Sequence, residues 1–372
     1  MRIFHIQGDQ FNELDTLPEN LPATGYLWVG SARREFEVQS AVLQSVLQNW
    51  TGGQLVDLHV SDLLNNQLPS HFDYTSWYDV LVFRRLAAGE GSAPMFLDDS
   101  KGTAATARAA LDAIDTSPVG FALFDRVLLT VHPTDCQVRE FFANRLQQQA
   151  LPAGGDARMV EGRTAARLPA SAADLMLRMV NHMVDSYLEL RRLLTKQLTY
   201  LQQELFNPRS RFDNWQMLLE SRNALHLLED TCEDQRSAIT EWIDALDEWP
   251  EAVDKSARRE RELLRVRSRD VLEHIERVLG HVRRLESSAE TAVQMHFSAQ
   301  SNRTNDIMRT LTVLTAIFMP LNLVTGFFGM NFEELPLIHS MSGFWAVFLV
   351  MLVLGIGLSM FFWRKRYLGS SR

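Results

Sequence analysis

Two apolar segments near the C-terminus constrain this chain more than any other feature. Residues 307–328 and 344–363 are each close to 20 residues long and mostly apolar, the length that crosses a bilayer as a helix. Arg309 is the only formally charged residue in either segment. It stands at the entrance of the first, where its long side chain can reach the membrane surface. The sequence therefore predicts two transmembrane helices.

Basic residues flank these segments. Arg303 precedes the first, and Arg364, Lys365 and Arg366 follow the second. Because basic loops stay on the cytoplasmic side, both ends of the pair are predicted to be cytoplasmic and the loop between them external.

The N-terminal residues resemble neither a signal peptide nor a transit peptide, since their apolar run is short and acids follow quickly. The soluble part is therefore expected to be cytoplasmic as well.

The first third of the chain predicts a mixture of strands and helices. Short β-rich runs are separated by Gly, Pro, Asn and Asp, which is typical of strands joined by turns. The expected strands are 2–6, 25–29, 54–60, 77–84 and 119–131, the last turning at Asp125-Arg126 into two. The expected helices are 35–48, 104–113 and 136–148.

The middle of the chain has helical periodicity. Helices are expected from Ser171 to Asn207, from 214 to 246 and from 251 to 328. Apolar residues alternate by four and three in the last of these, which is typical of a helix packed lengthwise against others. The positions are Val271, Ile275, Val278, Val282, Leu285, Ala289, Ala292 and His296.

These patterns predict an α+β cytoplasmic domain, a long helical stalk and two C-terminal transmembrane helices. The predicted boundaries are 1–155 for the α/β domain, 171–306 for the stalk, 307–328 for the first transmembrane helix, 329–343 for the outer loop, 344–363 for the second transmembrane helix and 364–372 for a basic cytoplasmic tail.

Composition excludes several classes of function. The net charge of -9 argues against nucleic-acid binding, which needs a basic surface. Cys136 and Cys232 are too far apart in the sequence for a metal-ligand motif. No nucleophile elbow, phosphate loop or HExxH motif occurs. The sequence therefore predicts neither an enzyme nor a prosthetic group.

The first transmembrane segment carries a stripe that a simple anchor does not need. Polar, small and flexible residues recur at spacings of three and four, and polar groups in a bilayer face protein or water. Several copies around an axis would line a water-filled pore. A seam between packed helices is the alternative, because such residues also hold membrane helices together. The stripe consists of Asn305, Met308, Thr312, Thr315, Met319, Asn322 and Gly326.

A motif follows this helix directly. The sequence Phe-Phe-Gly-Met-Asn-Phe ends the segment, with Gly329, Met330 and Asn331 at its centre. At this place it resembles the Gly-Met-Asn signature of the CorA-type magnesium transporter family, which includes a zinc-transporting branch. The resemblance extends to 301–306 and 317–321, and to 58–64 and 127–133 in the N-terminal region.

The resemblance implies a funnel-shaped homopentamer in a bacterial inner (plasma) membrane, with the first transmembrane helix lining the pore. Gly329, Met330 and Asn331 would form the selectivity filter, with Asn331 holding the ion through its hydration waters. Met308 and Leu311 would stand at the family's hydrophobic gate. Thr312 fits the stripe better than Leu311, so these two compete for the inward position. The implied pore-lining residues are Asn305, Met308, Leu311, Thr312, Thr315, Met319 and Asn322.

Some positions depart from the family pattern. Leu337 replaces a Glu of the outer loop found in many relatives, although Glu333 and Glu334 can still form an acidic ring there or be simply solvated. Gln294 falls near a stalk position where some relatives have a magnesium-sensing Asp. An acidic cluster on the second long helix can bind cations or pair with the basic run 255–269. Its members are Glu229, Asp230, Glu233, Asp234, Glu241, Asp244, Asp247 and Glu248.

The stripe and the resemblance together predict a divalent-cation channel, and the resemblance implies that it conducts Mg2+ down its electrochemical gradient. The chemistry of the stripe suits this ion, because Mg2+ binds oxygen and dehydrates reluctantly. The closest alternative keeps the architecture and transports Zn2+, Co2+ or Ni2+. The stalk also carries His274, His281 and His296. Zinc transport therefore stays an alternative, since imidazole suits zinc better than magnesium. The other alternative is a membrane-anchored coiled-coil scaffold or sensor without conduction. The predicted partners are further copies of the chain, the lipid bilayer and divalent cations, with no nucleic acid.

Overall fold

The computed structural model consists of two compact units, Met1–Ala289 (unit 1) and Glu290–Arg372 (unit 2). The residues that it describes are 1–88, 111–112, 114–133, 136–150, 168–206, 215–249, 254–330 and 341–365.

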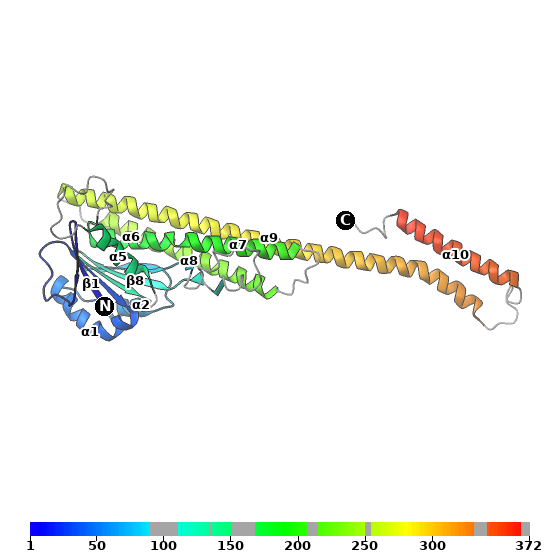
Figure 1. Cartoon of the computed structure of the whole chain (residues 1–372), viewed down its shortest axis with the longest axis horizontal. Helices are drawn as coiled ribbons and strands as arrows, with labels where there is room; N and C mark the ends of the chain where they lie inside the picture. The colour runs from blue at the N-terminus through cyan, green and yellow to red at the C-terminus, as the bar shows by residue number, and fades with distance from the viewer. Residues whose placement is uncertain are drawn as a thin grey trace. The chain divides into compact units, whose positions relative to one another are not determined.

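Unit 1 contains a seven-stranded sheet with the order β2-β1-β3-β9-β8-β5-β4 (Figure 1). The pair β3–β9 is parallel and the other pairs are antiparallel. The strands are β1 (Arg2–Gln7), β2 (Gln10–Leu14), β3 (Tyr26–Ala32), β4 (His71–Tyr74), β5 (Asp79–Arg84), β8 (Pro118–Phe124) and β9 (Val127–His132). A separate ribbon joins β6 (Ala87–Ala88) to β7 (Ile114–Asp115).

The central strands β8 and β9 are buried along their whole length, because helices cover both faces of the sheet. On one face, α1 (Arg33–Thr51) and α2 (Asp57–Leu64) bury Phe36, Leu43 and Leu63 against the sheet. On the other face lie helix α5 (Val138–Gln149) and the long helices (Figure 1). Trp242 belongs to this second core and packs edge-on against Phe72 of β4.

The expected strands at 2–6, 25–29, 77–84 and 119–131 are confirmed as β1, β3, β5 and the β8–β9 hairpin. The expected strand at 54–60 is wrong, because α2 begins within it. Leu55, His59 and Leu63 are the buried residues there, and a spacing of four is helical rather than alternating. Four short strands, β2, β4, β6 and β7, were not predicted. The expected helix 104–113 falls almost wholly outside the described residues.

The helical half of unit 1 contains α5 (Val138–Gln149), α6 (Ala172–Asp185), α7 (Tyr187–Phe206), α8 (Trp215–Glu248) and the start of α9 (Lys255–Phe328). The predicted helix from Ser171 is interrupted at Ser186, whose hydroxyl donates to the carbonyl oxygens of Met183 and Leu86. Such side-chain bonds to the backbone compete with helical ones.

Helix α6 is tied to α9 through a buried charge. The Ser171 hydroxyl caps α6 by accepting from the backbone N–H of Asp174. The Asp174 carboxylate is buried and forms ion pairs with Arg178 of α6 at 3.1 Å and Arg267 of α9 at 3.0 Å. Two guanidinium partners offset the cost of burying that carboxylate, so this contact fixes α6 against α9.

The heptad prediction for α9 is confirmed at its seven apolar positions from Val271 to Ala292, which are buried. The eighth position, His296, is half-buried. Unit 2 contains the remainder of α9 and α10 (Met341–Arg364). Both helices are long and apolar enough to cross a membrane, and almost none of either apolar stretch is buried within one chain. These surfaces therefore require lipid or protein from outside the chain.

Candidate functional site

The polar stripe of α9 lies on a surface that its own chain leaves uncovered. All seven of its residues are exposed, and the two methionines, Met308 and Met319, are 56% and 71% exposed. Leu311 is also exposed, at 57%, so exposure does not decide whether Leu311 or Thr312 points inward. The stripe comprises Asn305, Met308, Thr312, Thr315, Met319, Asn322 and Gly326.

The opposite face of α9 is the covered one. Its buried and half-buried residues in unit 2 are Arg309, Val313, Ala316, Ile317, Pro320, Leu321, Val324 and Phe328. At 3.6 residues per turn these residues lie about half a turn from the stripe. The buried and half-buried residues of α10 also form one face: Gly343, Val347, Met351, Gly355, Leu358, Ser359 and Phe362.

Helix α10 covers that face of α9. A Cβ placed on Gly355 of α10 would lie 3.7 Å from the Leu321 side chain of α9, so the two helices approach closely at this glycine. The division of α9 into a covered apolar face and an uncovered polar face follows from this packing. It leaves the stripe available to water or to other copies of the chain.

The threonines of the stripe present hydrogen-bond acceptors. The Thr312 hydroxyl donates to the carbonyl oxygen of Met308 at 2.8 Å, and the Thr315 hydroxyl donates to that of Leu311 at 2.9 Å. Because each hydroxyl proton is used within the helix, the oxygen's lone pairs remain free to accept. Oxygen acceptors suit a hydrated cation.

Helix α9 continues through Pro320 without a break. Proline has no N–H, so the carbonyl of Ala316 loses its usual partner one turn later. Both residues are half-buried on the α10 side. The missing bond therefore lies away from the exposed stripe.

The end of α9 requires a glycine. The Gly329 N–H donates to the Thr325 carbonyl oxygen at 2.9 Å, and a Cβ at Gly329 would lie only 2.9 Å from that same oxygen. A side chain at this position would therefore displace the backbone. Met330 follows and is 46% exposed, whereas the predicted site residues Asn331, Glu333 and Glu334 lie outside the described residues.

The stalk histidines are not brought together. His281 is hydrogen-bonded to the Tyr187 hydroxyl at 2.7 Å, and its pKa is lowered by burial and by the nearby arginines Arg191 and Arg284. His274 instead lies 3.4 Å from Asp185. These histidines therefore form no shared zinc site in the part of the chain that the structure describes.

The acidic cluster of α8 is partly ion-paired with α9. Asp247 pairs with Arg265 of the predicted basic run at 2.7 Å. Glu229 and Glu233 pair instead with Arg283, which lies beyond that run. The pairing hypothesis is thus confirmed at Asp247.

One group of potential metal ligands lies between these two helices, formed by His226, Glu229 and Glu286. Sequence reasoning singled out Glu229 alone. The spacing of three residues between His226 and Glu229 was an available signal, because it places both on one helix face. The contribution of Glu286 required the tertiary structure.

Comparisons with known proteins agree with this architecture. A family model described as CorA-like Mg2+ transporter protein matches residues 105–366. A relative from Thermotoga maritima, named cobalt/magnesium transport protein CorA, is 33% identical over 100 residues, which is 27% of this chain and 28% of the relative. One of the same name from Methanocaldococcus jannaschii is 42% identical over 57 residues, 15% of this chain and 18% of the relative. The matched stretches thus span less than a third of these curated relatives.

Two solved structures share the fold along nearly the whole chain. The CorA magnesium transporter from Methanocaldococcus jannaschii aligns with a TM-score of 0.68 at 16% identity and covers 98% of both chains. The full-length CmaX protein aligns with a TM-score of 0.64 at 15% identity, covering 98% of this chain and 97% of the other. At such identities the likeness concerns the fold.

Proposed function

Since this chain belongs to the CorA-like Mg2+ transporter family, we propose that it is a channel that conducts divalent cations, with Mg2+ as the favoured ion. The observation that carries the proposal is the division of α9 in unit 2. Helix α10 covers the apolar face, and the polar stripe opposite it remains exposed. Copies of α9 arranged around an axis would turn these stripes toward a common water-filled path.

The chemistry of the stripe fits a hydrated divalent ion. Asn322 contributes a neutral amide, and Thr315 contributes a hydroxyl oxygen with free lone pairs. Neutral oxygens hold a hydrated ion through its waters without trapping it, as conduction requires. An inside-negative potential favours inward flow of a divalent ion by roughly 4.6 kcal/mol per 100 mV.

The proposed assembly is a homopentamer in a bacterial inner membrane, with both termini in the cytoplasm. Residues 307–328 and 344–363 cross the bilayer, and 329–343 form the outer loop with Asn331 as the ion-selecting residue. Exposed apolar residues on α10, such as Trp345 at 61% and Val353 at 62%, support contact with lipid. The chain acts as a transporter without catalysis or a prosthetic group.

Cobalt is the second candidate ion, because two relatives with matching stretches are named cobalt/magnesium transport proteins. Zn2+ and Ni2+ are tested in the same experiment.

The test is flux into liposomes that contain the purified full chain and an ion-sensitive dye. We expect Mg2+ entry that increases with an inside-negative potential. Thr315→Ala should change the rate or the ion selectivity, since it removes an oxygen from the stripe. Thr310→Ala is the matched control, because its hydroxyl makes the same kind of backbone bond, to Asp306, from a different side of the helix.

Absence of flux for Mg2+, Co2+, Zn2+ and Ni2+ in folded, oligomeric protein would overturn the proposal and favour a scaffold or sensor. Equal effects of Thr315→Ala and Thr310→Ala would remove the stripe as the conducting surface. Unchanged selectivity in Asn331→Ala would remove that residue as the selecting element.

A further inference from the structure

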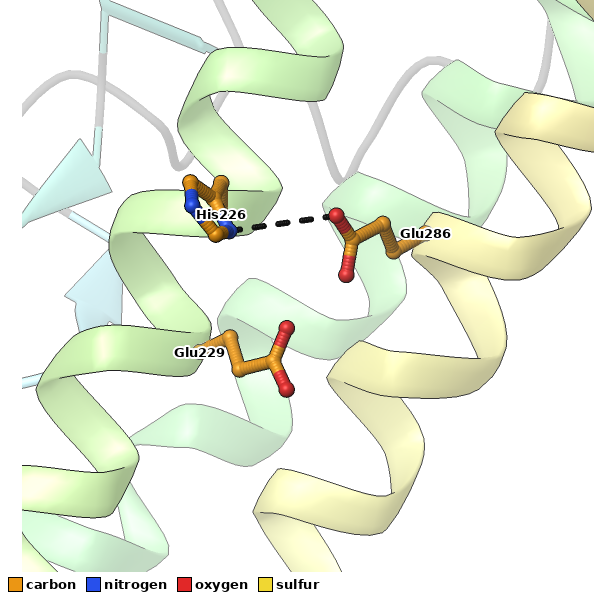
Figure 2. Close-up of side chains that lie close together, drawn as sticks. All are labelled: His226, Glu229 and Glu286. Atoms are coloured by element: carbon orange, nitrogen blue, oxygen red, sulfur yellow. Dashed lines mark ion pairs between the residues drawn. The ribbon is translucent and has the colours of Figure 1, made fainter.

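A histidine and two glutamates meet between α8 and α9 in unit 1. His226 and Glu229 lie on α8, and Glu286 lies on α9. One donor atom from each residue lies within 4.8 Å of the others, and Figure 2 shows the three side chains extending into the space between the two helices. We propose that this triad binds one divalent transition-metal ion of the zinc class and so holds α8 against α9.

The distances fit a metal better than a direct bond. His226 Nδ1 lies 3.9 Å from a carboxylate oxygen of Glu286, too far for a hydrogen bond. Two ligands that each lie about 2.0–2.2 Å from a zinc ion are about 3–3.5 Å apart in a tetrahedral site. Small side-chain rotations therefore bring the donors into coordination.

The donor set selects the kind of metal. One imidazole nitrogen and two carboxylate oxygens suit Zn2+ and its neighbours, whereas Mg2+ prefers oxygen ligands throughout. Three protein ligands leave a position for water. The Glu229 and Glu286 side chains are only 18% and 21% exposed, so bulk water screens their charges incompletely.

The proximity of the two carboxyl groups also points to a shared cation. One carboxylate oxygen of Glu229 and one of Glu286 lie within 4.8 Å of each other. Two carboxyl groups this close repel each other when both are ionised, unless a proton or a cation lies between them. A bound metal ion relieves that repulsion with both groups ionised.

Arg283 competes with the metal for one ligand. Its Nε donates to Glu229 at 2.6 Å, and its Nη2 donates to Glu233. A metal at the triad must draw Glu229 away from this guanidinium, which also repels the cation. The affinity is therefore set by a competition between Arg283 and the metal. Loss of Arg283 should strengthen metal binding, although it removes two ion pairs from the metal-free protein.

The experiment is equilibrium dialysis of the purified full chain in detergent against ZnCl2, with Mg2+ in excess. We expect one Zn2+ per chain that depends on the triad. His226→Ala and Glu286→Gln should each weaken its binding by about tenfold or more, and Arg283→Gln should strengthen it. Co2+ in place of Zn2+ should give a visible absorption band that is lost in His226→Ala.

His274→Ala is the matched control, since it removes a histidine from α9 outside the triad. Size-exclusion elution and the melting temperature establish that each variant is folded. Equal Zn2+ affinity and stoichiometry in the unaltered chain and both triad variants would overturn the inference. So would weaker binding in Arg283→Gln. Because binding is measured without an ion gradient, the outcome is independent of whether the chain conducts.

Discussion

Helix α9 carries two stripes of regularly spaced residues, one mainly in each unit, and the two stripes meet different surroundings. In unit 1 the stripe is apolar, and Ile275 and Val282 are fully buried against helices of the same chain. In unit 2 the stripe is polar, and Thr315 and Asn322 are exposed. The spacing of three and four residues is common to both.

The difference shows that spacing alone indicates only which face of a helix makes contacts. The polarity of that face tells what covers it. An apolar stripe is covered by the chain's own core, as at Ile275. A polar stripe in an otherwise apolar helix requires water or polar groups, and α10 supplies neither, because it packs on the other side at Leu321.

The largest expected effect is the loss of folding stability when a buried side chain of the unit 1 stripe is shortened. Ile275→Ala should lower the stability of unit 1 by about 2–4 kcal/mol, because it opens a cavity in a fully buried core. Val266→Ala, on the same helix but 61% exposed, should cost less than about 0.5 kcal/mol. The measurement is the melting temperature of the full chain. Equal shifts for the two variants would contradict the burial of this stripe.

The sequence predicted much of the fold because its periodic signals are long. The heptad positions from Val271 to Ala292 and the β8–β9 hairpin at Asp125-Arg126 were identified correctly. The segment 54–60 was wrongly assigned as a strand, because tertiary contacts decide which of its residues are buried. There the Tyr78 hydroxyl accepts from the Val56 N–H and lies 2.9 Å from His59 Nδ1, and no local pattern reveals such partners.

The candidate site was predictable only in part. The stripe from Asn305 to Asn322 follows from helical spacing, but its exposure depends on where α10 packs, which spacing does not indicate. Glu286 shows the same limit, since it joins His226 and Glu229 across two helices that are far apart in the sequence. The roles of the stripe residues and of Asn331 stay predictions.

A smaller effect is expected at the end of the unit 2 stripe. Gly329→Ala places a Cβ 2.9 Å from the Thr325 carbonyl oxygen, and overpacking of this kind costs about 1–3 kcal/mol. The strain falls where the chain leaves the helix, so flux should fall while the melting temperature of unit 1 is unchanged. Gly357→Ala on α10 is the control, because a Cβ there meets no atom within 4 Å. Equal flux in both variants would show that the end of the helix adapts freely.

The smallest expected effect is a pH-dependent change in the stability of unit 1 that leaves ion flux through unit 2 unchanged. Burial, and the nearby charge of Asp125, raise the pKa of Asp79 in unit 1 to about 6 from 3.8. Ionised Asp79 therefore destabilises the folded state above pH 6, and this penalty disappears as the pH falls toward 3.8. Asp79→Asn should raise the melting temperature by about 2–4 °C at pH 8, after allowance for solvent screening, and by progressively less toward pH 4. Asp125→Asn should give a smaller rise, since burial is the larger cause, and flux should be unchanged in both. A rise that is independent of pH would show that Asp79 acts through packing rather than through its charge.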